Sequence, residues 1–216
     1  MGYLQFLRRL HQRVQPDWYL EVGTARGRSL GFVACNAIAI DPRFRLAEPT
    51  LGAKPVQVLL QMTSDAAFAG PVMARLDPRF DLAFLDGMHR FEVLLRDLIN
   101  TERHMAPNGM IVLHDTAPYT ARMTGRDALP GPWTGDVWKL LPILAEHRPD
   151  LRVDHLDCAH TGLTLIRGPW GGGDALDRHH DAIVERYAPL DLATWGPARF
   201  YRDHAPVSAL GVLETV

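Results

Sequence analysis

Four side chains near the middle of the chain have the types and spacing of a site that holds a cation and moves a proton. Asp86 and His89 follow one apolar run, and His114 and Asp115 follow the next. Two unpaired carboxylates that lie close together repel each other, and a bound cation is one usual relief. A divalent ion lowers the pKa of a hydroxyl group, and a histidine can then take the proton. These residues predict a metal site at Asp86, His114 and Asp115, with His89 as general base.

Histidine is an unusual member of such a ligand set. Neutral imidazole suits manganese, iron or zinc better than magnesium. Whether a metal is bound, and whether it is magnesium or manganese, therefore stays open. His114 could instead be a second base, or a packed histidine bonded to backbone. For His89 the alternative is a residue at the start of a helix that faces water.

A glycine turn upstream has the form of a ligand-binding loop. The segment Glu21–Ser29 follows a short apolar run and precedes a predicted helix. Gly23 lets the chain turn sharply out of the strand, and Gly27 lets backbone approach a ligand. A dinucleotide fingerprint has a further glycine that admits the pyrophosphate, whereas here Thr24 and Ala25 stand where it would fall. The loop therefore predicts a site for a smaller anion, such as a carboxylate.

Asp41 ends the second predicted strand, 20 residues after Glu21. A carboxylate at this place can accept both hydroxyls of a ribose, in nicotinamide and adenosyl cofactors alike. An aspartate directly before Pro42 is also a common turn-former. The residue by itself leaves both interpretations open.

These residues need strands that end at one place. Short runs that are apolar on both faces alternate with segments of helical periodicity, which is typical of a parallel sheet covered by helices. The pattern predicts an α/β fold with a doubly wound, mostly parallel sheet and an antiparallel C-terminal strand pair, and ligands of such a sheet bind beyond the carboxyl ends of its strands. The predicted strands are 18–22, 36–40, 55–61, 80–85, 110–113, 151–156 and 161–167, and the predicted helices are 1–16, 27–34, 65–69, 91–104, 136–147 and 174–186.

Residues 116–134 are rich in glycine, proline and threonine and follow no period. A long irregular segment inside a compact domain is usually a functional loop or a disordered one. As a lid or acceptor wall, this part of the chain would offer Tyr119, Trp133 and Trp138 to sugars or aromatic rings. The alternative is a partly disordered surface loop with Trp138 in the core.

Two arginines of the same loop, Arg122 and Arg126, could meet an anionic acceptor, although arginines on loops are more often solvated. Farther along, Gly171–Gly173 is interpreted as a hinge. The tail from Pro189 shows no period and is predicted to be irregular.

The 216 residues carry a net charge of −2, and 47% of them are hydrophobic. This balance is typical of a globular chain and excludes a disordered or collagen-like one. It predicts no nucleic-acid partner and no membrane span. Cys35 and Cys158 are the two cysteines, which argues against a disulfide framework and for a reducing, cytoplasmic setting. A homo-oligomer is compatible with the sequence. We expect one domain over 1–216, with an N-terminal helix (1–16), a cofactor-binding core (17–168), and a C-terminal helix and tail (169–216).

Four runs in this order, Tyr19–Leu30, Ala39–Pro42, Asp81–His89 and Gly109–Thr116, resemble the motifs of class I S-adenosylmethionine-dependent methyltransferases. Within that class the sequence is most similar to the branch of macrolide-sugar O-methyltransferases and cephalosporin-hydroxylase-like proteins. The resemblance covers roughly residues 18–168. It implies the Rossmann-like fold of the class and O-methylation of a small-molecule hydroxyl, of sugar or phenol (catechol) type.

The resemblance also implies where the donor S-adenosylmethionine lies. Its methionine end would be near Gly23, its ribose on Asp41 and its adenine near Thr63. Some relatives hold a magnesium ion on an acid and a following acidic pair, with a catalytic histidine three residues after the first acid, where His89 stands. The sequence departs from these relatives at His114, where they have an acid. The cofactor-binding residues implied are Glu21, Gly23, Thr24, Gly27, Ser29, Asp41, Ser64, Asp65 and Asp86.

Two rival functions use the same fold. A nicotinamide-dependent oxidoreductase is disfavoured, because the central glycine of the fingerprint is missing and no Tyr-x-x-x-Lys pair occurs. A donor-binding accessory domain that has lost catalysis is the second rival, and the departure at His114 is its main support.

Overall fold

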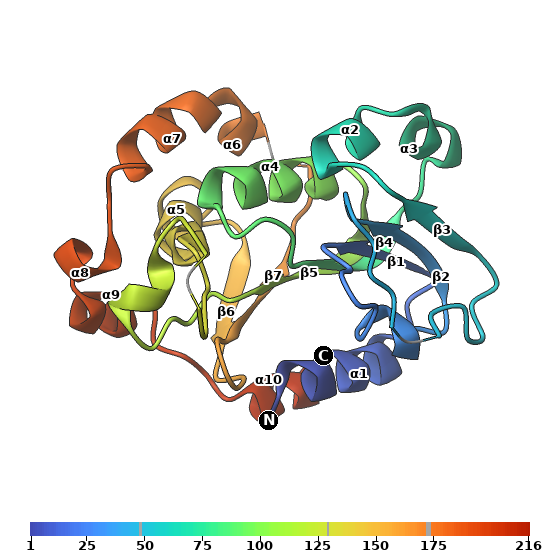
Figure 1. The fold of residues 1–216 in the computed structure, drawn as a ribbon, viewed down its shortest axis with the longest axis horizontal. Helices are drawn as coiled ribbons and strands as arrows, with labels where there is room; N and C mark the ends of the chain where they lie inside the picture. Colours follow the sequence, from blue (N-terminus) through green and yellow to red (C-terminus); the bar gives the residue numbers. More distant parts are fainter. Residues whose placement is uncertain (48, 129, 172–173) are drawn as a thin grey trace.

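The computed structural model describes residues 1–47, 49–128, 130–171 and 174–216. Its centre is one sheet with the strand order β3-β2-β1-β4-β5-β7-β6 (Figure 1). Neighbouring strands from β3 to β5 are parallel, and β7 is antiparallel to both β5 and β6. The predicted doubly wound sheet with an antiparallel C-terminal pair is confirmed. The strands are β1 (Trp18–Val22), β2 (Asn36–Ile40), β3 (Gln57–Leu60), β4 (Phe80–Leu85), β5 (Met105–His114), β6 (Arg152–Leu156) and β7 (Leu163–Arg167).

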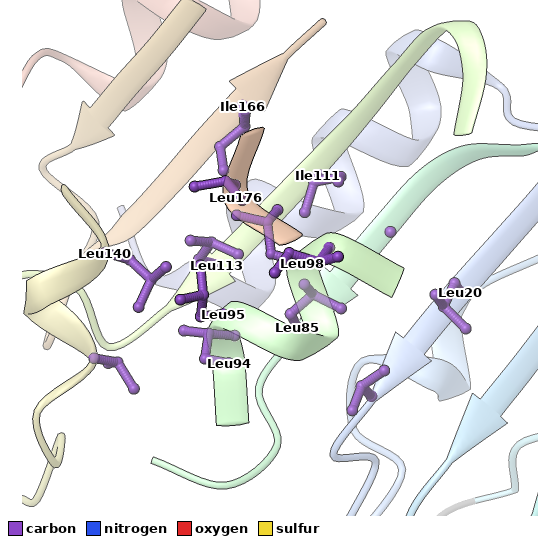
Figure 2. Packing of buried hydrophobic residues seen from close by; sticks show 14 of the residues in the cluster. Leu20, Leu85, Leu94, Leu95, Leu98, Ile111, Leu113, Leu140, Ile166 and Leu176 are labelled. Atoms are coloured by element: carbon purple, nitrogen blue, oxygen red, sulfur yellow. The ribbon is translucent and has the colours of Figure 1, made fainter. Parts of the chain in front are cut away.

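Helices cover both faces of the sheet (Figure 1). One face carries α4 (Phe91–Glu102), whose leucines at helical spacing point at β4 and β5. Figure 2 shows Leu94, Leu95 and Leu98 of α4 packed among Leu85, Ile111 and Leu113 of these strands. Burial of this apolar stripe holds α4, and the turn that precedes it, against the ends of the strands. The same face also carries α5 (Leu140–His147), α6 (Asp174–Arg178) and α7 (His180–Tyr187).

The opposite face is covered by α1 (Tyr3–Val14) and α10 (Ala209–Glu214). Phe6, Leu7 and Leu10 of α1 lie in the same buried cluster as Val212 and Leu213 of α10. The two ends of the described chain therefore pack side by side under the sheet (Figure 1). None of the helices in the described ranges is long and apolar enough to cross a membrane.

The tail is not irregular, so that prediction is wrong. It forms α8 (Leu192–Trp195), α9 (Pro197–Asp203) and α10. Asp191 and Ser208 cap α8 and α10 with their side chains, and Pro197 begins α9. Caps and an N-terminal proline start short helices that have too few turns to show a period. Tertiary packing then holds them, because Trp138 is 0% exposed against Leu192 and Phe200.

Three other element predictions need correction. The helix expected at 27–34 is only a 3-10 turn over Leu30–Phe32, in a segment that glycines make a poor helix former. The helix expected at 91–104 ends at Glu102, and β5 begins at Met105 and runs through Asn108-Gly109. The helix expected at 174–186 is divided into α6 and α7. The predicted hinge falls partly on Gly172 and Gly173, which lie outside the described residues. The helices α2 (Ser64–Phe68) and α3 (Pro71–Leu76) follow β3.

Candidate functional site

The carboxyl ends of β1, β2, β4 and β5 surround a cavity of about 680 Å³. Parallel neighbours end at the same edge of a sheet, and the chain reverses its winding between β1 and β4, where ligands of such sheets bind. Most of the predicted site residues therefore come together although they are far apart in the sequence. Those that line the cavity are Gly23, Asp41, Ser64, Asp65, Asp86, His89, His114 and Asp115.

At position 23, where the glycine turn begins, only glycine fits. Its φ is +89°, and a Cβ at this position would lie 1.9 Å from the backbone oxygen of Asp86. Its N–H donates to the oxygen of Ile40 at 2.9 Å. Gly27 is also in the left-handed region, but it packs against Thr50 and does not line the cavity. The turn thus passes directly over the end of β4.

A smaller cavity of about 270 Å³ adjoins the turn on its other side. Thr24 and Ser29, both predicted as binding residues, line this space instead of the larger one. Arg28 and Tyr3 line it as well, and Gly23 and Asp86 line both cavities. The two cavities therefore adjoin at the glycine turn, and the smaller one is lined by arginines that include Arg28. Tyr3, which comes from the first turn of α1, was missed by sequence reasoning.

Glu21 lies beneath the turn and lines neither cavity. It is fully buried, and its Oε2 accepts a hydrogen bond from the Tyr19 hydroxyl at 2.7 Å. Burial raises the pKa of Glu21 to about 7, although the hydroxyls of Tyr19, Ser29 and Thr24 act in the opposite direction. Glu21 therefore packs against the glycine turn and does not face a ligand in the large cavity.

Asp41 forms the turn that its place before Pro42 suggested, and it also lines the cavity. Its Oδ1 accepts from the N–H of Arg43 at 2.7 Å, which is an aspartate turn, and its Oδ2 accepts from Ala25 N–H at 2.7 Å. The second bond ties the end of β2 to the glycine turn. Each carboxylate oxygen has a further lone pair, and the residue lines the cavity. Asp41 can therefore shape the turn and still accept hydroxyl groups.

The far end of the cavity contains Ser64 and Asp65 at the start of α2. Asp65 is held by Arg96 of α4, with Nε–Oδ1 and Nη2–Oδ2 distances of 3.1 and 3.0 Å. Asp97, the next residue, is 1% exposed, and its carboxylate has no hydrogen-bond partner among the described residues. Burial raises the pKa of Asp97 to about 6, although the Ser64 hydroxyl opposes this. Sequence reasoning missed Asp97; an acid between the apolar positions of α4 is the signal that could have found it.

The acid and histidine residues converge at the other end of the cavity. Oδ1 of Asp86 lies 3.1 Å from Nδ1 of His114 and 3.5 Å from Nε2 of His89. Oδ2 of Asp115 lies 3.2 Å from Nδ1 of His89, and its Oδ1 lies 3.4 Å from Nδ1 of His114. One ligand atom from each of Asp86, His114 and Asp115 falls within 4.8 Å of the others. This arrangement can hold a divalent ion.

The carboxylates favour protonation of both imidazoles. Burial alone would lower the pKa of His114, but Asp86 and Asp115 outweigh it and raise the pKa to about 10. The pKa of His89 is raised for the same reason. Conversely, burial would raise the pKa of Asp86, but the two histidines lower it. The side chain of His89 is 22% exposed, so it is not a histidine that simply faces water at the start of a helix. The side-chain bonds of His114 are made with carboxylates and not with backbone.

The loop after β5 is only partly as expected. Trp138 offers no face to an acceptor, because it is completely buried. Arg126 neither faces an acceptor nor is free in solvent: it forms ion pairs with Glu92 and Asp136. Trp133 stacks on His89, with ring centroids 4.8 Å apart and planes inclined by 17°. One face of that indole is therefore already covered by the predicted base.

Comparison with known proteins agrees with these observations. Residues 20–116, slightly less than half of the chain, match the model of a family described as a methyltransferase domain. No curated protein matches the sequence significantly.

Solved structures share the fold at low sequence identity. The O-methyltransferase from Bacillus cereus in complex with SAH is 13% identical, with a TM-score of 0.60 over 76% of this chain and 79% of that one. Cofactor-bound Rv0187 from MTB is 19% identical, with a TM-score of 0.61 over 78% and 80%. The O-methyltransferase TomG from Streptomyces achromogenes, involved in tomaymycin synthesis and solved with SAM, is 17% identical, with a TM-score of 0.57 over 76% and 78%.

Proposed function

We propose that this protein is a class I S-adenosylmethionine-dependent methyltransferase that transfers the donor's methyl group to a hydroxyl oxygen of a small molecule, of sugar or phenol type. The observation that carries the proposal is the position of His89. Its imidazole lies between the carboxylates of Asp86 and Asp115 in the same cavity as the glycine turn. In its neutral form this imidazole would be a proton acceptor beside a hydroxyl group placed there, and the two carboxylates would stabilise the imidazolium that forms.

The two adjoining cavities support an arrangement for the donor. The turn at Gly23 leaves no room for a side chain, so backbone alone faces a ligand that crosses it. The amino-acid end would enter the smaller cavity, where Arg28 and Ser29 offer a cation and a hydroxyl to its carboxylate. The ribose would lie on Asp41, and the adenine near Ser64 and Asp65 at the far end of the larger cavity.

The donor set of Asp86, His114 and Asp115 fits a divalent ion. Two carboxylates and one imidazole within 4.8 Å of each other are compatible with manganese, and less so with magnesium because of the imidazole. When bound, such an ion lowers the pKa of the acceptor hydroxyl and orients it. Asp86 and Asp115 would then hold the ion as well as flank His89.

The chain's own residues account for the rest of the reaction. In methyl transfer the acceptor oxygen forms a bond to the methyl carbon while the bond from that carbon to the sulfonium sulfur breaks, and the sulfur leaves as a neutral thioether. The hydroxyl proton passes to the imidazole of His89 in its neutral form. The remaining contribution is alignment, because in-line displacement depends on the position of the three reacting atoms.

Calorimetric titration with S-adenosylmethionine, S-adenosylhomocysteine and NAD, with and without MnCl2, tests the donor assignment. We expect both adenosyl compounds to bind and NAD not to bind. Transfer is then measured on a panel of sugars and phenols for the wild type, for His89→Ala, and for the matched control His179→Ala, an exposed histidine that does not line the cavity. We expect His89→Ala to lose about 100-fold or more in rate with unchanged donor affinity, and the control to lose nothing.

The rivals give different results in the same experiment. Binding of NAD without the adenosyl compounds would indicate the oxidoreductase. Donor binding without turnover on any acceptor would indicate the accessory domain. Full transfer by His89→Ala would show that another group is the base.

A further inference from the structure

The start of α4 is capped by a residue from a distant segment. Arg90 precedes the helix and makes no side-chain cap. Instead, the N–H of Phe91 donates to Oδ1 of Asp136 at 2.9 Å, across 45 positions of sequence. Asp136 is 2% exposed. A carboxylate at this end of a helix satisfies a free N–H and interacts favourably with the helix dipole.

Cations hold that carboxylate in place. Oδ2 of Asp136 accepts from Nη1 of Arg126 at 2.6 Å and from Nζ of Lys139 at 2.9 Å. Arg126 also pairs with Glu92 in the first turn of α4. Ion pairs and hydrogen bonds between Asp136, Arg126 and Glu92 therefore attach the loop after β5 to the start of α4.

The same segment contacts His89 at its backbone and at its ring. The N–H of Asp136 donates to the oxygen of His89 at 3.3 Å. Gly135 lies so close that a Cβ there would be 1.8 Å from that oxygen. Trp133 stacks on the imidazole, and its Nε1 donates to the oxygen of Gly125 at 2.6 Å, which fixes the indole. Residues 133–136 thus bind both ends of the His89 residue.

We propose that Trp133 and Asp136 are positioning residues that hold the His89 imidazole between Asp86 and Asp115. The inference rests on the proposed function, in which His89 takes the acceptor proton. His89 lies in the turn between β4 and α4 rather than in either element, so neither the sheet nor the helix by itself orients its ring. Trp133 restricts the ring from one face, and Asp136 fixes the backbone and the helix that follows.

The proposal predicts a graded effect at Trp133. Loss of the flat ring in Trp133→Leu should lower kcat by about 10- to 100-fold, because a base that is displaced by about 1 Å loses much of its rate advantage. Trp133→Phe keeps a flat surface and should recover most of the rate. The dissociation constant of S-adenosylhomocysteine and the donor KM should stay the same in both, because Trp133 does not line the donor cavity.

Trp170→Leu is the matched control. Trp170 is also half-buried and also donates from Nε1 to a glycine oxygen, that of Gly109 at 2.9 Å, but it lies at the other end of β5. If loss of any indole lowers kcat equally, the stacking on His89 is not the cause and the proposal is overturned. Asp136→Asn, which keeps an oxygen for Phe91 N–H but weakens the ion pairs, should lower kcat less than Trp133→Leu.

A readout that does not depend on activity is the proton NMR signal of His89 Hε1, identified by its loss in His89→Ala. Stacking under an indole shifts this signal upfield. Trp133→Leu should move it downfield, toward the position of a free histidine, whereas Trp170→Leu should leave it in place. An unchanged signal in Trp133→Leu would overturn the proposal, and so would a moved signal with wild-type kcat. If His89→Ala itself transfers at the wild-type rate, the base assignment is wrong and the positioning proposal, which rests on it, is overturned, whereas the NMR signal then reports only whether Trp133 stacks on His89.

Discussion

Two of the buried clusters among the described residues combine carboxylates with cations in different ways. One lies where α4 ends: Arg148 is 2% exposed and donates from Nη1 to both oxygens of Glu102, each at 2.7 Å. The same guanidinium reaches Asp150 at 2.9 and 2.8 Å. The other cluster is the site at the ends of β4 and β5, where the cations are the imidazoles of His89 and His114.

The two clusters differ in whether the cationic group can lose its proton. A guanidinium is protonated at every working pH and offers donors in a fixed fork, so the Arg148 cluster is permanent. An imidazole can lose its proton and then accept one or bind a metal. In the Arg148 cluster the carboxylates are neutralised by a guanidinium whose charge is permanent. In the site they are neutralised by imidazoles, which can lose their protons and then bind a metal ion or accept a proton from a substrate.

The largest expected effect concerns the permanent cluster. Arg148→Met should lower the free energy of unfolding by about 3–5 kcal/mol, because it leaves the buried carboxylate of Glu102 without its cation. Urea denaturation measures this, and the double variant Glu102→Met/Arg148→Met should recover much of the loss. A loss below about 1 kcal/mol in the single variant would contradict the comparison.

A substitution in the cluster at the ends of β4 and β5 should change ligand binding more than it changes stability. Asp115→Asn should weaken binding of Mn²⁺ by about 100-fold, because it removes a charged ligand. Its stability should change little, since asparagine tolerates the φ of +60° found at this position. Isothermal titration with MnCl2 measures the affinity, and Asp150→Asn in the Arg148 cluster is the control. Equal Mn²⁺ affinity in Asp115→Asn and the wild type would remove Asp115 from the metal site.

Glu21 tests what a buried acid costs when it forms no ion pair with any of the described residues. Its pKa is about 7 in the folded protein against an ordinary value of 4.5. The folded state therefore binds more protons between these values, and stability should fall as pH rises from 4.5 to 7 and then level off. The free energy of unfolding of Glu21→Gln should gain up to about 3 kcal/mol relative to wild type across this window. The free energy of unfolding of both proteins is measured by urea denaturation at pH 5 and pH 8. If the difference between the two proteins is the same at both pH values, Glu21 does not titrate as inferred.

The smallest effect is expected for an ion pair in water. Arg103 and Asp177 lie 2.5 Å apart, but both side chains are 52% exposed. Arg103→Gln should change the free energy of unfolding by about 0.5 kcal/mol or less. Thermal unfolding at low and high salt provides the measurement, and a loss as large as that of Arg148→Met would show that burial is not what separates these pairs.

Sequence patterns were sufficient for the parts of the site that sit at strand ends. Apolar runs located the strands, and a parallel sheet brings their carboxyl ends to one edge. That reasoning placed Gly23, Asp41, Asp86, His89 and Asp115 around one cavity, as the structure does. It left open whether Trp138 lies in the core, because the burial of a tryptophan depends on what packs against it. It was wrong about the tail, because short capped helices leave no period.

The sequence by itself therefore determined the strands of a mostly parallel, doubly wound sheet and the acids and histidines at its edge, because these follow from local periodicity and from the geometry of parallel strands. Only the tertiary structure decided that Tyr3 and Asp97 border the cavities, that Glu21 lies beneath the turn, and that Asp136 caps α4. Each of these contacts joins segments that are distant in the chain or depends on the direction of a side chain, and neither property leaves a repeating pattern in the sequence.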